Sequence, residues 1–336
     1  MTTVATPEQE IPFVPSKRPP RPPRGWKPPR GVSVPSSRKR KGPGRPPRLP
    51  VPPRPKREAA PGSAVIATAL LALAGLCVWA LLQLFVLGGV AEARSQADLR
   101  DQLRLSLSAQ TAPLGGLIDP GAPVALLEIP TLGLEQVVVE GTASGDTMAG
   151  PGHVRSSPLP GQPGVSQILG RSGTYGGPFR SIETLRAGDG IRVTTGQGVF
   201  VYRVDRVRRA GDPLPVPLAS GTSRLTLVTA EPDGVLGALR PTQTVYVDAT
   251  LQGDTVGAPS GRPAAVPAAE RPMAADTSAL PVLVLAVQAL LATVVCIGLA
   301  RRWVPSRVAW VLGVPVLLVF LWLTSELAFR LLPNIA

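Results

Sequence analysis

The sequence predicts a mainly β protein: a closed β-barrel of seven or eight strands outside a membrane, with three transmembrane α-helices and a disordered N-terminal tail. Three apolar segments are each longer than the roughly 20 residues that a helix needs to cross a bilayer. Short strand-like runs fill most of the interval between the first apolar segment and the second. The 40 prolines and 35 glycines among 336 residues leave much of the remaining chain without the means to build a packed core.

Residues 1–62 form the predicted disordered cytoplasmic tail, which carries nearly all of the net charge of +13. Residues 1–60 hold 15 Lys and Arg against three Asp and Glu, whereas the other residues hold 20 against 19. A basic, Pro-rich segment without apolar periodicity favours polyproline II over a folded domain. We expect it to meet anionic lipid or a proline-reading cytoplasmic partner. The phrase KGPGRPPR resembles a DNA-binding AT-hook, but any Pro/Arg-rich tract produces such a phrase, so nucleic acid is not the expected partner.

The three apolar segments, residues 63–90, 280–300 and 308–332, are predicted to be transmembrane helices. The first is longer than the apolar part of a signal peptide and follows a long tail, so it is expected to remain as an uncleaved anchor. The tail and the loop RRWVPSR, residues 301–307, are basic, and positive charge marks the cytoplasmic side. We therefore expect a multi-pass protein of the plasma membrane, with a cytoplasmic N-terminus and with the barrel and C-terminus outside.

Two connecting segments flank the predicted barrel. Residues 91–112 place Leu99, Leu103 and Leu107 four residues apart among charged residues, which is typical of a helix and predicts a stalk that continues the anchor. Residues 253–279 are rich in Ala, Pro and Gly and are expected to form a flexible linker. The folded domain is therefore expected at residues 113–252.

Strand signals dominate residues 113–252. Seven runs rich in Val, Ile, Thr and Tyr are separated by Gly, Pro and Asp turns. The runs are ALLEIP, EQVVVEG, SQILG, GIRVTT, GVFVYRVDRV, RLTLVTAE and QTVYVDATL. Because almost no helical pattern separates them, they predict a closed antiparallel or mixed barrel. A β-sandwich with the same number of strands is the alternative.

The order of phrases in this domain resembles the sortase family. IPTLGLEQVVVEGT, GPGHVRSSPLPGQPG, LGRSGTYGGPFRSIETLRAGDGIRVTT, YRV and RLTLVTAEPDG follow one another within residues 126–251. They are most similar to the class E sortases of high-GC Gram-positive bacteria, the actinobacteria. There, a phrase resembling Gly-His-Arg-x-x-Tyr-Gly-x-Pro-Phe precedes a Leu-Thr-Leu-x-Thr-Cys strand.

This resemblance implies a sortase-type barrel at the cell envelope and the chemistry of a cysteine transpeptidase. In such an enzyme a thiolate attacks a backbone carbonyl of a Leu-Pro-x-Thr-Gly-type sorting signal. A histidine serves as the acid and base partner, and an arginine stabilises the oxyanion. The acyl group then passes to an amine of the cell wall or of a pilin.

Carried over residue by residue, the resemblance places the nucleophile at Ala230, the histidine at Arg171 and the arginine at about Thr244, with Arg240 nearby. Ala230 has no atom beyond Cβ that could form an acyl intermediate. The guanidinium of Arg171 stays protonated near neutral pH and cannot serve as a general base. Thr244 offers a neutral hydrogen bond in place of a cationic donor. The resemblance therefore implies a catalytically degenerate member with no intact catalytic residue, although the scaffold residues Tyr175, Gly176, Pro178 and Phe179 are retained.

The only histidine, His153 in the phrase GPGHV, is expected to make a loop hydrogen bond. A substitute triad can be drawn with Thr229 or Ser172 as the nucleophile. Glu231 or Asp233 would then orient the imidazole, although no spacing in the sequence supports the arrangement.

Neither a metal nor another cofactor is expected. Both cysteines, Cys77 and Cys296, lie inside apolar segments, which leaves no cysteine-rich metal site outside the membrane. The residues expected to line the cleft are Arg171, Tyr175, Thr229, Glu231 and Arg240. Arg171 is expected to replace the lost cation and to attract an acidic ligand or a carboxylate.

Two functions follow from these observations and stay open at this point. The first is a sortase-like pseudoenzyme that acts as an adaptor or regulator. Its partner would be a sorting-signal peptide, a wall precursor, an active sortase or another envelope protein. The second is an active transpeptidase or hydrolase that uses a non-cysteine nucleophile or a residue supplied by a partner.

Overall fold

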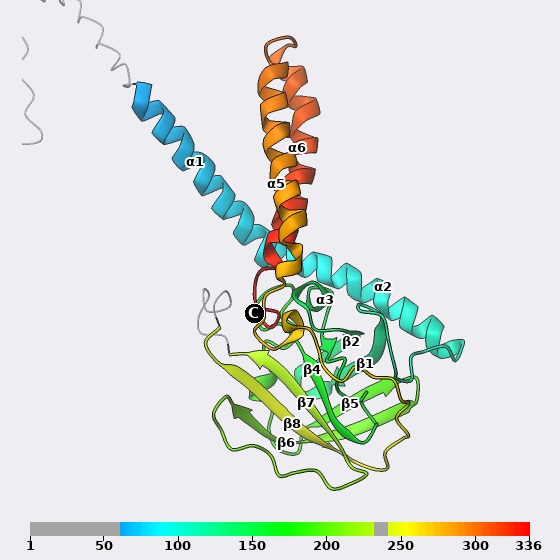
Figure 1. Cartoon of the computed structure of the whole chain (residues 1–336). Coiled ribbons are helices and arrows are strands. Elements are labelled where there is room, and N and C mark those ends of the chain that lie inside the picture. Colours follow the sequence, from blue (N-terminus) through cyan, green and yellow to red (C-terminus); the bar gives the residue numbers. More distant parts are fainter. Residues whose placement is uncertain (1–60, 232–240) are drawn as a thin grey trace, which may run out of the picture. The chain divides into compact units, whose positions relative to one another are not determined.

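The computed structural model describes residues 61–231 and 241–336 (Figure 1). The predicted disordered tail, residues 1–62, lies almost entirely outside the described residues. Asp233 and Arg240, two of the residues singled out in the sequence, also lie outside them.

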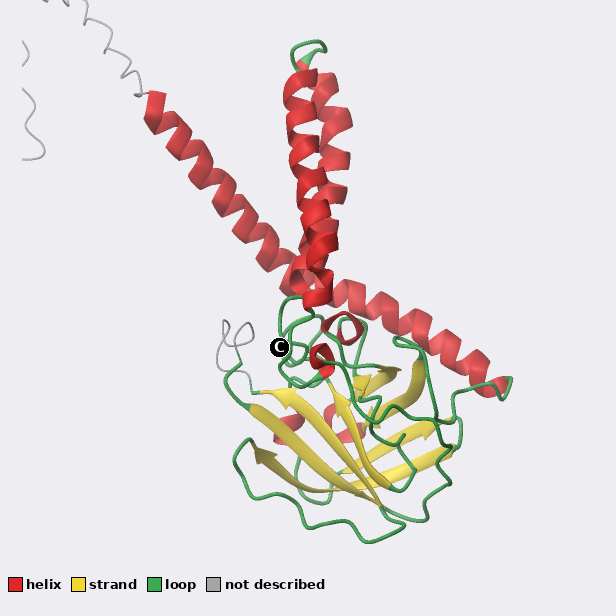
Figure 2. Cartoon of the chain, viewed as in Figure 1, coloured by secondary structure: helices red, strands yellow, loops and turns green. Residues whose placement is uncertain are grey.

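The described chain folds eight strands into a closed barrel (Figure 2). The strands are β1 (Pro123–Ile129), β2 (Leu134–Glu140), β3 (Gly152–His153), β4 (Gly164–Leu169), β5 (Gly190–Thr195), β6 (Gly198–Arg209), β7 (Ser223–Ala230) and β8 (Thr244–Leu251). Their order is β1-β2-β3-β4-β7-β8-β6-β5, and β5 pairs with β1 to close the circle. β2 with β3 and β4 with β7 are parallel pairs, and the other pairs are antiparallel. The predicted closed barrel is confirmed, and the alternative β-sandwich is wrong.

The alternation of side chains along β7 separates the barrel core from the outer face. Leu225 and Leu227 lie in the main hydrophobic core, where Val247 of the neighbouring β8 joins them. Val228 and Ala230 lie in a second apolar cluster on the opposite face of the strand. β7 therefore delivers Ala230 to the outside of the barrel wall.

The first apolar segment and the predicted stalk form one helical path. It consists of α1 (Pro61–Leu82), a π-helical turn η1 (Gln83–Leu87) and α2 (Gly88–Ser108). Leu99 and Leu103 of α2 pack against Val137 and Val139 of β2, so the predicted apolar stripe faces the barrel wall. The side-chain amide of Gln96 fixes this contact, because it donates to the carbonyls of Val137 and Ala149 and accepts from the amide of Val137.

The second and third apolar segments form the helices α5 (Leu280–Ala300) and α6 (Ser306–Phe329), which lie side by side (Figure 1). By length and composition, three helical segments of the described chain can cross a membrane: Ile66–Ser108, Thr277–Ala300 and Arg307–Phe329. The prediction of three such helices is confirmed.

Residues 253–279, for which the composition predicts a flexible linker, follow the barrel surface in this structure. The amide of Val256 donates to the carbonyl of Gly161 at 3.0 Å. Further along, Thr142 Oγ1 donates to the carbonyl of Glu270 at 2.6 Å, and the carboxylate of Glu270 lies 3.4 Å from Arg155 Nε. The linker thereby reaches the end of the barrel that carries the candidate site.

Candidate functional site

The positions that the family resemblance marks as altered lie at one end of the barrel. Ala230 is the last residue of β7 and pairs with Thr244, the first residue of β8. β4 runs parallel to β7 with Leu169 opposite Val228, so the loop that follows β4 brings Arg171 to the same end. The sequence predicted these three positions as one site, and the fold places them together.

The guanidinium of Arg171 is completely buried. Its Nη1 donates to Thr174 Oγ1 at 2.9 Å, and its Nη2 donates to the carbonyl and the hydroxyl of Ser144 at 3.0 and 2.8 Å. Among the described residues, no ion pair includes Arg171. Burial lowers the pKa of Arg171 to about 10, which leaves the group charged at neutral pH. Arg171 thus directs its charge into the protein and does not present it to solvent.

Tyr175 lies between this guanidinium and the helical turn η1 that follows α1. The centre of its ring is 5.2 Å from Arg171 Cζ, and its backbone adopts a positive φ of 48°. Burial raises the pKa of Tyr175. The ring packs with Leu84 of η1 and with Met148, and a Cβ on Gly88 would come within 3.2 Å of it. The residues at the junction of η1 and α2 therefore cover the ring of Tyr175, which lies beside Arg171.

Ala230 is completely buried, and a later part of the chain contributes to its cover. Ile335, which follows α6, packs against Val154, Leu169, Val228 and Ala230, and it is completely buried. The chain itself therefore covers the position at which the resemblance places the nucleophile.

The structure does not bring together the substitute triad that can be drawn from the sequence. The hydroxyl of Thr229 donates to the carbonyl of Gly170 at 2.9 Å. Glu231 accepts hydrogen bonds from Arg209 through both carboxylate oxygens, and Arg209 lowers the pKa of Glu231. His153 contacts neither residue, because its ring nitrogens are engaged elsewhere. The version of the triad with Thr229, His153 and Glu231 is therefore wrong, whereas the version with Asp233 falls outside the described residues.

His153 instead belongs to a buried chain of groups that the sequence reasoning missed. Its Nδ1 lies 2.8 Å from Glu140 Oε2, and its Nε2 lies 3.0 Å from both Ser157 Oγ and the carbonyl of Pro158. An acid, a histidine and a serine thus follow one another in the order used by hydrolases. The cavity beside them has a volume of only about 10 Å³, roughly the space for one water. The Ser157 hydroxyl also accepts from the amide of Gln167, so the arrangement holds the loop together and leaves no room for a substrate.

Asp146 in the short helix α3 (Ser144–Thr147) predicts a pH dependence of stability. Burial raises its pKa from the ordinary 3.8 to about 6, and the negative charges of Glu270 and Asp276 add to the effect. Because the folded-state pKa is raised, the folded protein binds this proton more tightly than the unfolded chain does. The stability that this proton contributes is complete below pH 4 and is lost as the pH rises through 6.

We expect the free energy of unfolding of the wild type to fall by about 2 kcal/mol relative to Asp146→Asn between pH 4 and pH 7. Chemical unfolding of the two full-length proteins in detergent, at pH steps across this window, measures the difference. Parallel pH profiles for the two proteins would contradict the assignment to Asp146.

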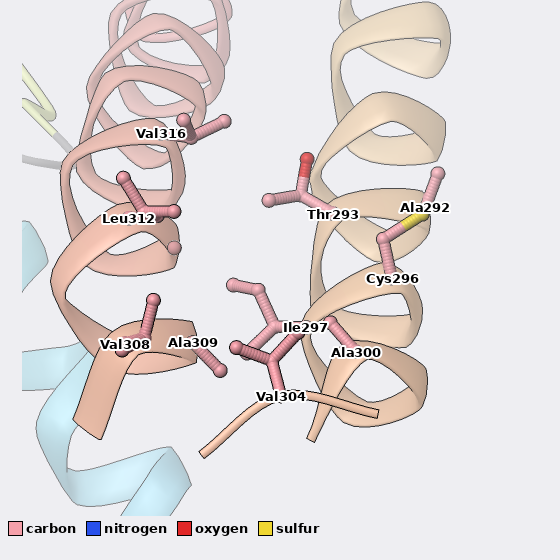
Figure 3. Close-up of a pocket in the computed structure, with 11 residues that line it drawn as sticks. Ala292, Thr293, Cys296, Ile297, Ala300, Val304, Val308, Ala309, Leu312 and Val316 are labelled. Carbon is pink, nitrogen blue, oxygen red and sulfur yellow. The ribbon is translucent and has the colours of Figure 1, made fainter. Parts of the chain in front are cut away.

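A larger cavity of about 390 Å³ lies between α5 and α6, away from the barrel (Figure 3). Figure 3 shows Thr293, Cys296 and Ile297 of α5 facing Leu312 and Val316 of α6 across it. Its lining is almost wholly aliphatic. This cavity could therefore hold an apolar group such as an acyl chain, but the described residues that line it include no carboxylate or histidine for acid–base chemistry.

Comparisons with known proteins bear on residues 127–251, which match the family model described as the sortase domain. The chain is 28% identical over 130 residues to sortase D of Bacillus subtilis, a match that covers 38% of this chain and 64% of that protein. It is 28% identical over 201 residues to sortase SrtE1 of Streptomyces coelicolor, covering 54% of this chain and 57% of that protein. The chain thus spans less than two thirds of the length of these curated relatives. A solved structure of sortase E from Streptomyces avermitilis is 30% identical, with coverage of 46% of this chain and 100% of that chain and a TM-score of 0.34.

Proposed function

Because the chain carries a sortase domain at residues 127–251, we propose that it is a membrane-anchored sortase-like pseudoenzyme of the cell envelope, which works by binding and without transpeptidation. It serves as an adaptor or regulator for a sorting-signal peptide, a wall precursor, an active sortase or another envelope protein. The basic residues of 1–60 and of 301–307 support a cytoplasmic N-terminus and a barrel outside the plasma membrane.

The observation that carries this proposal is the chemistry at the end of β7. Ala230 presents a methyl group that is completely buried in the apolar cluster that Ile335 joins, so this position offers no nucleophilic atom and is closed to solvent. Arg171 remains charged at neutral pH and uses three of its hydrogen bonds on Ser144 and Thr174. Position 244 itself carries a neutral threonine in place of a cationic donor, and its hydroxyl donates to the sulfur of Met273 at 3.3 Å.

We expect the full-length protein to show no turnover of sorting-signal peptides. The test incubates the detergent-purified chain with fluorogenic Leu-Pro-x-Thr-Gly-type peptides and an amine acceptor, and it looks for product and for a covalent adduct by mass spectrometry. A cysteine-containing sortase in the same mixture is the positive control.

Product formed by the wild type and abolished by Ser157→Ala, Thr229→Ala or Ser172→Ala would contradict the proposal and favour a non-cysteine nucleophile. Turnover that requires an added envelope protein would favour a partner-supplied residue. Saturable peptide binding without product supports the pseudoenzyme.

A further inference from the structure

The chain fills the cleft beside Ala230 with the residues that follow α6, numbers 332–336, here termed the post-helix segment. Asn334, Ile335 and Ala336 are each completely buried. We propose that the cleft is a peptide-binding site whose resident ligand is the post-helix segment, so that an external peptide binds only in competition with it. This inference rests on the proposed binding function and names the class of ligand, a short turn-forming peptide with a β-branched apolar residue.

Ile335 supplies the side chain that the site holds. It packs against Val154, Leu169, Val228 and Ala230, which together offer an apolar pocket on the outer face of the barrel. Tyr246, Val266 and Met273 pack around the same cluster. Because position 230 carries only a methyl group, the branched side chain of Ile335 can lie directly against the strand.

The main chain of the post-helix segment is recognised as well. The amide of Ser172 donates to the carbonyl of Ile335 at 3.2 Å, and the hydroxyl of Thr174 donates to the carbonyl of Ala336 at 2.7 Å. The hydroxyl of Ser144 donates to the carbonyl of Leu332 at 3.0 Å. These hydrogen bonds reach the backbone carbonyls of Leu332, Ile335 and Ala336, and backbone hydrogen bonds of this kind hold a peptide whatever its side chains are.

Arg171 organises two of these three donors. A hydroxyl group has one proton to donate and lone pairs that accept. Because Arg171 donates to the hydroxyls of Ser144 and Thr174, each hydroxyl is free to direct its proton at the post-helix segment. A buried arginine that is charged at neutral pH therefore has a binding role at this position, which explains its burial without a carboxylate among the described residues.

Asn334 fixes the turn of the post-helix segment. Its Nδ2 donates to the carbonyl of Thr142 at 2.6 Å and to that of Arg271 at 2.9 Å. Its amide donates to the carbonyl of Ala274, and the amide of Ala336 closes the turn onto the carbonyl of Pro333 at 3.1 Å. Hydrogen bonds therefore hold the segment both to the barrel domain and to the residues between β8 and α5.

The sequence of the post-helix segment agrees with this role. It reads Leu-Pro-Asn-Ile-Ala, which shares the Leu-Pro pair and a β-branched fourth residue with the Leu-Pro-x-Thr-Gly-type signal. The β-branched Ile335 is the residue of this segment that joins the apolar cluster of Ala230. With a methyl group at that position, the segment is held and no acyl transfer can follow.

Occupancy of the cleft is tied to the membrane helices. The amide of Asp276, just before α5, donates to the carbonyl of Arg330, just after α6, at 3.0 Å. The post-helix segment begins two residues later. Movement of the α5–α6 pair away from the barrel would therefore withdraw Ile335 from its pocket and open the site.

The first test measures how well the post-helix segment covers position 230. Ala230→Cys is introduced into the full-length chain after Cys77 and Cys296 have been replaced by alanine, and the rate of maleimide labelling is followed in detergent. Ile335→Asp places a charged group in the apolar pocket, and deletion of residues 333–336 removes the ligand altogether. Both changes are expected to raise the labelling rate at position 230 at least tenfold.

Val201→Cys, on β6 and 45% exposed, is the matched control, and its labelling rate is expected to stay the same in all backgrounds. A control rate that rises together with the rate at position 230 would show loss of the fold in that variant, and the other variant then decides. Equal labelling of position 230 with and without residues 333–336, whether fast or slow, would overturn the inference.

The second test uses a fluorescent peptide with the sequence Leu-Pro-Asn-Ile-Ala. We expect saturable binding to the protein that lacks residues 333–336 and at least tenfold weaker binding to the full-length chain. Ala230→Leu in the shortened protein should abolish binding by filling the pocket, whereas Val201→Leu should not. Equal binding to both forms, or to neither, contradicts the inference. Neither test depends on turnover, so a failure here is distinguishable from a failure of the pseudoenzyme proposal.

Discussion

Gly152→Ala is expected to destabilise the barrel by more than about 4 kcal/mol. A Cβ on Gly152 would overlap the carbonyl oxygen of Gly141, which is backbone and cannot rotate away. β3, which contains Gly152, pairs with β2 on one side and β4 on the other, so a shift of its backbone would break both ladders. Chemical unfolding of the full-length variant in detergent, followed by circular dichroism, measures the loss.

Gly190→Ala is the matched control for this prediction. Gly190 opens β5, and a Cβ there would meet nothing within 4 Å. Its substitution should change the free energy of unfolding by less than about 1 kcal/mol, because alanine costs less backbone entropy than glycine in a strand. Similar losses in the two variants would show that the contact with Gly141 is not the cause.

His153→Ala is expected to cost about 3–5 kcal/mol of unfolding free energy. The side chain of Glu140 is only 3% exposed, and its Oε2 lies 2.8 Å from the imidazole. Removal of the imidazole leaves this carboxyl group buried without that partner, and it also removes the imidazole contacts of the Pro158 carbonyl and the Ser157 hydroxyl. Denaturant unfolding of the single variant measures the effect.

A second substitution separates two contributions to this loss of unfolding free energy: the carboxyl group of Glu140 left without its partner, and the lost packing of the imidazole. Glu140→Gln in the His153→Ala background removes the ionisable group and should recover at least about 1 kcal/mol. Glu140→Gln alone should be destabilising, because it weakens the contact with His153. If the two substitutions were simply additive, Glu140 and His153 would not be coupled, and the buried chain of groups would not hold the loop.

The barrel and its strand ends follow from local pattern in the sequence. The run RLTLVTA predicts the strand and its end at Ala230, whereas the outer position of Ala230 is a finding of the structure. The sequence pattern does not predict β3, because a strand of two residues is too short to show alternation. Its place in the sheet depends on the close approach of Gly152 to Gly141, a contact between segments that the sequence does not mark.

The contacts that decide the site are long-range, and for that reason the sequence did not reveal them. The pairing of Glu140 with His153 needs the parallel register of β2 and β3. Ile335 and Ala230 belong to one apolar cluster, but both α5 and α6 lie between them in the sequence. Local periodicity therefore carries no information about their proximity. Residues 308–332 form one apolar run, and nothing in the pattern indicates that the four residues after it fold back onto the barrel.

The order in which the chain is made has a consequence for the cleft. Proteins are synthesised from the N-terminus, and domains fold as they emerge. All eight strands are complete at Leu251, whereas Ile335 is added only after both α5 and α6. Every newly made molecule therefore passes through a stage in which the barrel has closed and the pocket beside Ala230 is vacant. During that interval, before α6 and the residues after it have been added, the pocket can take a different apolar peptide segment in the place of Ile335.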